Sequence, residues 1–148
     1  MKLMKNDNSS DADDILETLI TTKEIHDHIS KLKTKKASST DSILNEMIKC
    51  GRYYLVPTLQ KLFNDILNYG TFPTEWNIGV LKPIYKKRGD WWSPANYRGI
   101  TLTSCLGKLF TSILQSRLNK FTKQHHILNP EQFGFRPHAR AADSLFIL

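Results

Sequence analysis

The sequence has little cysteine, no long hydrophobic run and no secretory signal. Its 148 residues include only two cysteines, Cys50 and Cys105, which lack the clustered spacing of a zinc site. We expect both thiols to be reduced and buried. No apolar run approaches the ~20 residues that span a membrane, and the N-terminus lacks the hydrophobic core of a signal peptide. An intracellular protein without a membrane partner is therefore expected.

Carboxylates are scarce in the second half of the chain. After Asp90 the only acidic residues are Glu131 and Asp143. Neither has a partner at a spacing that makes a site, whereas two-metal catalysis needs several converging carboxylates. We therefore expect no metal site and no catalytic residue in this chain alone.

The formal net charge of +7 is unevenly distributed. Residues 1–41 contain seven Lys and eight Asp or Glu, so that region is close to −1 and the rest close to +8. A basic body predicts a nucleic-acid partner whose affinity falls as salt rises, and the nucleus is then one candidate compartment. Basic proteins also bind membranes and acidic proteins, so charge by itself is weak evidence.

Hydrophobic periodicity predicts a mostly helical α+β chain behind an acidic leader. Residues 1–20 carry few large apolar groups near their start and are expected to form a disordered leader. Thr21 and Glu24 make a capping-box pattern before a helix over 22–33. Lys33 to Thr40 reads as a basic loop.

Further helices are expected along the rest of the chain. Asp41 is expected to cap a helix that ends near Gly51, and Pro57 to start a helix that Gly70 ends. Residues 104–120 make another helix, and a last one begins at Ala141. The expected buried face of 104–120 comprises Leu106, Leu109, Phe110, Ile113, Leu114 and Leu118.

A basic β-hairpin is expected between the third and fourth helices. Residues 78–85 and 97–103 are two runs of mostly β-favouring residues, with turn-forming residues between them. Lys86 would close the first strand and Arg98 open the second, which brings an ammonium and a guanidinium side by side. That arrangement suits a triphosphate. The alternative is a solvated edge on which lysines prevent aggregation.

Trp91 and Trp92 lie at the expected tip of this hairpin. Tryptophans beside basic residues can stack on bases of single-stranded nucleic acid. The pair is equally compatible with a surface that packs against another domain.

Three blocks of the sequence stand out: KKASSTDSILNEMIK at 35–49, PIYKKRGD and NYRGITLTSCLGKLF within 83–110, and EQFGFRP at 131–137. Together they resemble reverse transcriptases of non-long-terminal-repeat, LINE-type (jockey-like) retrotransposons. The resemblance runs from about Thr22 to the C-terminus and keeps the order of the blocks. It implies that residues 21–148 are the N-terminal fingers part of a polymerase right hand, truncated before the palm core.

The resemblance also implies roles for individual residues. Lys86 and Arg98 would bind the phosphates of the incoming deoxynucleoside triphosphate. The other candidates, which would contact nucleic acid, are Lys35, Lys36, Gln132 and Arg136. The implied partners are an RNA template and a DNA primer.

In this family the Mg²⁺ ions are held by aspartates downstream of the GFR block. Only eleven residues follow Pro137 here, so we expect the chain alone to hold no Mg²⁺ and to be inactive. The functions left open are a fragment of an RNA-directed DNA polymerase, a domesticated nucleic-acid- or protein-binding module, and an inactive relic of the element.

The chain departs from the family pattern in its first block. The family has glycine where Ser39 and Ser42 stand. Glycine permits a positive φ, and a side chain in such a conformation costs on the order of 1 kcal/mol or more.

Overall fold

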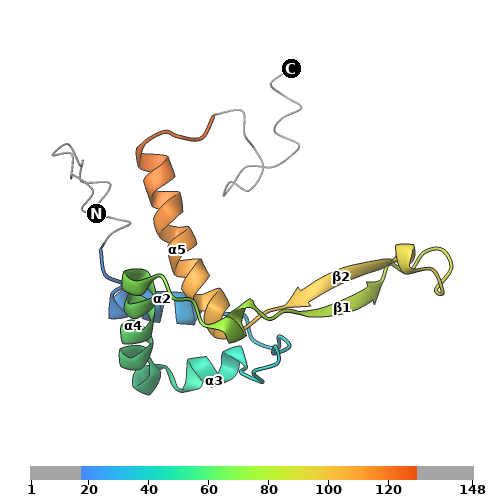
Figure 1. Ribbon diagram of the computed structural model, residues 1–148, viewed down its shortest axis with the longest axis horizontal. Coiled ribbons are helices and arrows are strands. Elements are labelled where there is room, and N and C mark those ends of the chain that lie inside the picture. Colours follow the sequence, from blue (N-terminus) through green and yellow to red (C-terminus); the bar gives the residue numbers. More distant parts are fainter. Residues whose placement is uncertain (1–17, 130–148) are drawn as a thin grey trace. The chain divides into compact units, whose positions relative to one another are not determined.

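The computed structural model describes residues 18–129, so residues 1–17 and 130–148 lie outside the description. The chain divides into two compact units, and the larger unit is Leu19–Leu114. The expected α+β class, mostly helical with one hairpin, is confirmed (Figure 1). The elements in chain order are α2 (Thr22–Lys31), α3 (Asn45–Cys50), α4 (Arg52–Tyr69), η1 (Thr74–Asn77), β1 (Val80–Tyr85), η2 (Pro94–Asn96), β2 (Tyr97–Leu102) and α5 (Cys105–Gln124), the last of which continues into the smaller unit.

The first described helix begins where its capping chemistry predicts. The Glu24 N–H donates to Thr21 Oγ1 at 3.2 Å, and the Thr21 N–H donates to Glu24 Oε2 at 2.9 Å. This reciprocal pair satisfies two N–H groups that the first turn cannot pair by itself. The predicted capping box is therefore confirmed, and α2 ends at Lys31, two residues before the expected end.

The expected starts of α3 and α4 were wrong. Asp41 Oδ1 accepts from the Ile43 N–H at 3.1 Å, which closes a local turn, and α3 begins only at Asn45. A short carboxylate that bonds its own backbone two residues on competes with helix capping. Pro57 lies inside α4 rather than at its start, because the apolar stripe extends back to Val56, which is buried.

The core of the larger unit joins four helices. Its aromatic centre contains Phe63, Trp76 and Phe110, with ring centroids 5.2 Å apart for Phe63 and Phe110 and 6.2 Å for Phe63 and Trp76. Around it lie the other buried apolar residues, Ile20, Ile25, Ile29, Ile48, Val56, Leu59, Ile66, Cys105, Leu109 and Ile113. The predicted face of the fourth helix is thus confirmed at its first turns, but Leu118 is 52% exposed and that part of the prediction was wrong.

Packing begins at the last residue of the segment expected to be a leader. Ile20 is fully buried, and its N–H donates to Asn64 Oδ1 at 2.6 Å. Its carbonyl accepts from Asn64 Nδ2 and Gln60 Nε2, both at 3.1 Å. Ile20 therefore ties the chain to α4 before α2 begins, while residues 1–17 lie outside the described part.

Both cysteines are free, but only Cys105 is buried as expected. Burial raises the pKa of the Cys105 thiol, which makes it a poor nucleophile. Cys50 is exposed, because α3 buries the face that bears Ile48 and Cys50 lies two residues, roughly 200°, around the helix. Within residues 18–129, no cluster of three or more His, Cys, Asp or Glu could hold a metal ion. No helix in the same range is long and apolar enough to cross a membrane.

A partly buried histidine connects α2 to the first half of α5. His28 Nδ1 lies 2.9 Å from Ser112 Oγ, and that hydroxyl donates to the Leu109 carbonyl at 2.7 Å. Since the hydroxyl proton is already used, His28 Nδ1 is assigned as the donor. Burial is the largest cause that lowers the pKa of His28, followed by the charge of Lys31.

The lowered pKa predicts that acid weakens the fold. The unfolded chain takes up a proton near the ordinary histidine pKa of 6.5, whereas the folded chain does so only at lower pH. The free energy of unfolding should therefore fall as the pH drops below about 6.5. Urea unfolding between pH 5 and 7.5 should show a smaller pH dependence for His28→Asn, which keeps a donor but does not titrate. Equal slopes for the two proteins would contradict this assignment.

Candidate nucleic-acid interface

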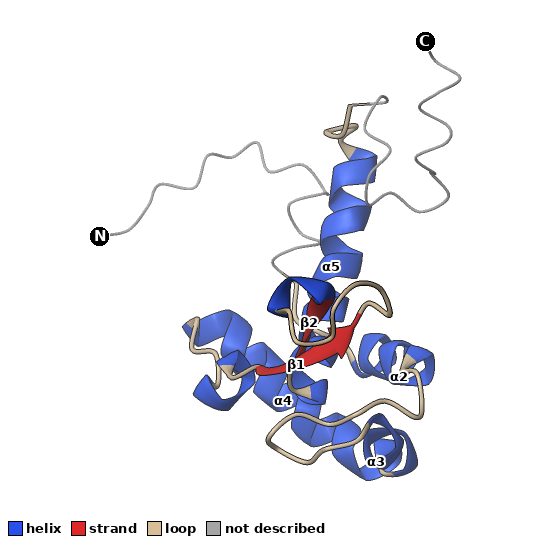
Figure 2. Ribbon diagram, turned by 90° about the vertical axis from the view of Figure 1, so that its right-hand side faces the viewer, coloured by secondary structure: helices blue, strands red, loops and turns tan. Residues whose placement is uncertain are grey.

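The basic hairpin forms with the expected strands. β1 and β2 pair antiparallel from Val80↔Leu102 to Tyr85↔Tyr97, within two residues of the predicted limits. The pairing continues past the strand end, where the Lys86 N–H donates to the Asn96 carbonyl at 2.8 Å. Figure 1 shows the hairpin extending away from α2, α3 and α4, and in Figure 2 it points toward the viewer. Most of its residues are exposed.

The register places three cations on one face of the hairpin. Arg98 lies opposite Ile84, and Lys82 opposite Ile100. Because alternate residues share a face, Lys82, Lys86 and Arg98 point to the same side. Arg98 is a diagonal neighbour of both lysines, at a Cα separation of about 7–8 Å in a regular antiparallel pair. We call these three residues the cation face.

Most donors on the cation face are unoccupied. Lys86 Nζ donates to the Ala95 carbonyl at 2.8 Å, which uses one of its three N–H groups. Lys82 and Arg98 are exposed, and neither has a hydrogen-bond or ion-pair acceptor among residues 18–129. The face can therefore donate hydrogen bonds to several oxygens of an anion, while the hydrogen bond to Ala95 holds Lys86 in one direction.

A network of hydrogen bonds holds the hairpin tip. Asn96 Nδ2 donates to the Asp90 carbonyl at 2.6 Å, and the Trp92 N–H donates to Asp90 Oδ1 at 3.0 Å. Gly89 takes a positive φ of 73°, and a Cβ there would lie 2.6 Å from Asn96 Nδ2. The turn therefore needs glycine at this position.

Two tyrosines close the same network from the strand ends. The Tyr85 hydroxyl donates to the Gly89 carbonyl at 2.5 Å, and the Tyr97 hydroxyl donates to the Trp91 carbonyl at 2.8 Å. Their rings lie 5.4 Å apart. The tip that carries the two tryptophans is thus ordered by side chains that come from both strands.

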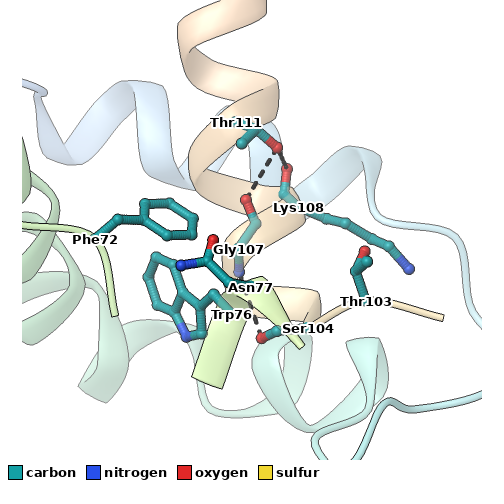
Figure 3. Close-up of a pocket in the computed structure, with 8 residues that line it drawn as sticks. All are labelled: Phe72, Trp76, Asn77, Thr103, Ser104, Gly107, Lys108 and Thr111. Atoms are coloured by element: carbon teal, nitrogen blue, oxygen red, sulfur yellow. Dashed lines mark hydrogen bonds between the residues drawn. The ribbon is translucent and has the colours of Figure 1, made fainter. Parts of the chain in front are cut away.

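A pocket lies where the hairpin joins the helices. Figure 3 shows the Phe72 and Trp76 rings on one side of it and Lys108 on the other. Its volume is about 240 Å³. Gly107 faces Trp76 so closely that a Cβ would lie 3.3 Å from Trp76 Cβ. Since ligand pockets usually span about 300–1,000 Å³, we regard this small pocket as part of the hairpin's attachment rather than as a ligand site.

The loop that carries Lys35 and Lys36 reaches the base of the hairpin but not the cation face. Both lysines are exposed. Ser39 Oγ donates to the Leu102 carbonyl at 3.2 Å, and the Lys35 N–H donates to the Glu46 carboxylate. The hydrogen bond from the Lys35 N–H is the main reason that the pKa of the Glu46 carboxyl is lowered. No hydrogen bond or ion pair joins the two lysines to the cation face within the described ranges. Gln132 and Arg136 lie outside the described residues.

The loop contains a serine in a conformation that favours glycine. Ser42 has a φ of 55°, at one of the two positions where the resembling family has glycine. Ser39, at the other position, is not among the positive-φ residues. The backbone therefore keeps a left-handed residue at position 42, at a cost that glycine would avoid.

Lys82 is the residue that sequence reasoning missed. From the sequence it entered only through the alternative of a solvated edge, together with Lys86, Lys87 and Arg88, whereas the register places it on the cation face. The signal was present, because Lys82 and Lys86 are four residues apart and a strand repeats every two. Only the pairing with β2 shows that Arg98 lies between them.

No protein-family model matches the chain. Among curated proteins it is 33% identical over 117 residues to the "Probable RNA-directed DNA polymerase from transposon BS" of Drosophila melanogaster, covering 79% of this chain and 13% of that protein. The corresponding protein of transposon X-element is 28% identical over 113 residues, 76% of this chain and 12% of the relative. The polymerase of mobile element jockey is 29% identical over 117 residues, which cover 79% of this chain and 13% of that polymerase. The chain thus spans only 12–13% of the length of these relatives.

The strain at Ser42 gives a first prediction for this region. Ser42→Gly should raise the free energy of unfolding by about 0.5–1 kcal/mol, because relief of the left-handed strain outweighs the added freedom of the unfolded chain. Ser38→Gly is the matched control, since Ser38 has no positive φ and should lose stability instead. Urea unfolding measures both variants. Destabilisation by both substitutions would refute the strain at position 42.

The tip network gives a second prediction. Gly89→Ala should strain the turn by about 1 kcal/mol or more and push Asn96 away from Asp90. Amide hydrogen exchange at Lys86 and Trp92 should become faster, while exchange in the helical core stays unchanged. Ser93→Ala is the control, because no side-chain hydrogen bond of Ser93 orders the tip within the described residues. Unchanged exchange in Gly89→Ala would show that the network does not hold the tip.

Proposed function

Because the chain is related to a segment of the RNA-directed DNA polymerases of LINE-type mobile elements, we propose that it is the fingers part of such a polymerase and that its hairpin binds the incoming deoxynucleoside triphosphate. The observation that supports the proposal is the cation face, where Arg98 lies between two lysines on one side of β1 and β2. Arg98 and Lys86 would hold the phosphates, and Lys82 would add a third positive charge.

The chemistry of the face suits a triphosphate. A guanidinium can bind two phosphate oxygens in parallel, whereas an ammonium acts as a compact charge. Arg98 has no competing acceptor among the described residues, so it is available to a ligand. Lys86 is held by Ala95 and therefore loses little conformational freedom when it binds.

The nucleic-acid strands would contact the other basic residues of the chain. We assign an RNA template and a DNA primer as partners in the complete polymerase, with Lys35 and Lys36 on one loop and Gln132 and Arg136 in the third block as contacts. The exposure of Lys35 and Lys36 supports their part in this assignment.

Mg²⁺ would be held by aspartates that this chain does not contribute. In a two-metal site the ions stabilise the attacking and leaving oxygens of the phosphoryl transfer. The residues of this chain would bind and orient the triphosphate, so we propose that the chain alone does not catalyse nucleotide addition.

Binding of a deoxynucleoside triphosphate to the full chain tests the cation face. Arg98→Ala should weaken binding about tenfold to a hundredfold, since a hydrogen bond to a charged group contributes about 1.5–3 kcal/mol. Lys82→Ala and Lys86→Ala should have smaller effects, because each removes a point charge. Isothermal titration calorimetry at fixed ionic strength gives the affinities.

Lys61→Ala on α4 is the matched control, because it also removes one exposed positive charge. Equal effects of Arg98→Ala and Lys61→Ala would reject a specific phosphate site. If the chain binds RNA but does not bind the triphosphate, the result would instead favour a nucleic-acid-binding module. The unoccupied cations are equally suited to that function.

A further inference from the structure

We propose that Trp91 and Trp92 form a stacking platform for unpaired bases of single-stranded nucleic acid. The platform lies at the tip of the hairpin, beyond the cation face, and would bind bases rather than phosphates. It stands whether or not the cation face binds a triphosphate, because the two indoles that carry it lie outside the cation face; the positive charge of the hairpin contributes to both proposals.

The two indoles are exposed and in contact with each other. Trp91 is 59% exposed and Trp92 is 74% exposed. Their ring centroids lie 4.1 Å apart, with 39° between the ring planes. The third tryptophan, Trp76, packs against Phe63, Phe72 and Phe110 instead. The tip therefore presents a continuous aromatic surface that the described part of the chain leaves open.

The backbone beneath the indoles is fixed before any ligand arrives. The Trp92 N–H donates to the Asp90 carboxylate, and the Trp91 carbonyl accepts from the Tyr97 hydroxyl. An aromatic side chain has only two rotatable bonds, so little further freedom is lost when a base stacks on it. A held, exposed aromatic pair is suited to binding rather than to packing within the described chain.

The surrounding charge identifies the ligand class. From Val80 to Leu102 the cations are Lys82, Lys86, Lys87, Arg88 and Arg98, whereas the single acid is Asp90. The Asp90 carboxylate already accepts a hydrogen bond from the tip backbone. Aromatic faces within a cationic surface match single-stranded nucleic acid, whose bases stack while its phosphates meet the cations. A paired duplex hides its base faces and could use only the charge.

Tryptophan fluorescence and anisotropy titrations with labelled RNA test the platform. In a Trp76→Phe background only the tip tryptophans emit, and a single strand of about 12 nucleotides should quench them. Trp92→Ala and the double variant Trp91→Ala/Trp92→Ala should bind the strand about tenfold more weakly or worse. Trp92→Phe should recover most of the affinity, because it restores an aromatic face.

Tyr54→Ala is the matched control, since Tyr54 is an aromatic residue on α4 that is 90% exposed. It should leave RNA affinity unchanged. The proposal fails if the double variant binds as tightly as the parent, if an abasic strand binds as well as a normal one, or if a duplex of equal length quenches equally. In the first case the pair would be assigned to a protein contact.

The same variants separate the two proposals. Triphosphate affinity should be unchanged in the double tryptophan variant, because neither indole lies on the cation face. Loss of triphosphate affinity in Arg98→Ala with normal quenching of the tip would support both proposals. If the chain binds the triphosphate normally but the single strand does not quench the tip tryptophans, the stacking platform is wrong and the triphosphate site is unaffected.

Discussion

The antiparallel register between β1 and β2 is the constraint on which the candidate interface depends. A shift of one residue would move Arg98 to the opposite face from Lys82 and Lys86. The register is fixed at the tip, where the Lys86 N–H bonds the Asn96 carbonyl. In the middle of the hairpin Leu81 covers Gly99, where a Cβ would lie 2.8 Å from Leu81 Cδ1. Any side chain at position 99 would displace Leu81.

A two-stranded hairpin has no core of its own and is marginal in isolation. Here its stability comes from both ends. At the base, Ser39 bonds the Leu102 carbonyl, and Trp76 packs on Gly107 at the start of α5. At the tip, hydrogen bonds from the two tyrosine hydroxyls and from Asn96 stabilise the hairpin in the absence of an apolar core. The exposed middle is left for the cations, so the fold positions them without burying them.

Local chemistry was predictable from the sequence and tertiary context was not. The capping box of α2 and the limits of the hairpin follow from short-range patterns, and both are confirmed. Asp41 and Pro57 are strong local signals whose outcome depended on a competing turn and on a longer apolar stripe. The place of Lys82 on the cation face required knowledge of the pairing, because no residue near it in sequence indicates its neighbour across the sheet.

Three cations share one exposed hairpin face, but each lies opposite an uncharged residue, Ile100, Ile84 or Asn96. Repulsion therefore acts only along the diagonals between Arg98 and the two lysines, at a Cα separation of about 7–8 Å. A lysine edge that only prevents aggregation would not need an arginine between two lysines on the same face. Proteins break local rules of stability mostly at functional sites and compensate for the cost elsewhere in the fold. A polyanion that meets Lys82, Lys86 and Arg98 together would remove the repulsion and so stabilise the folded hairpin as it binds.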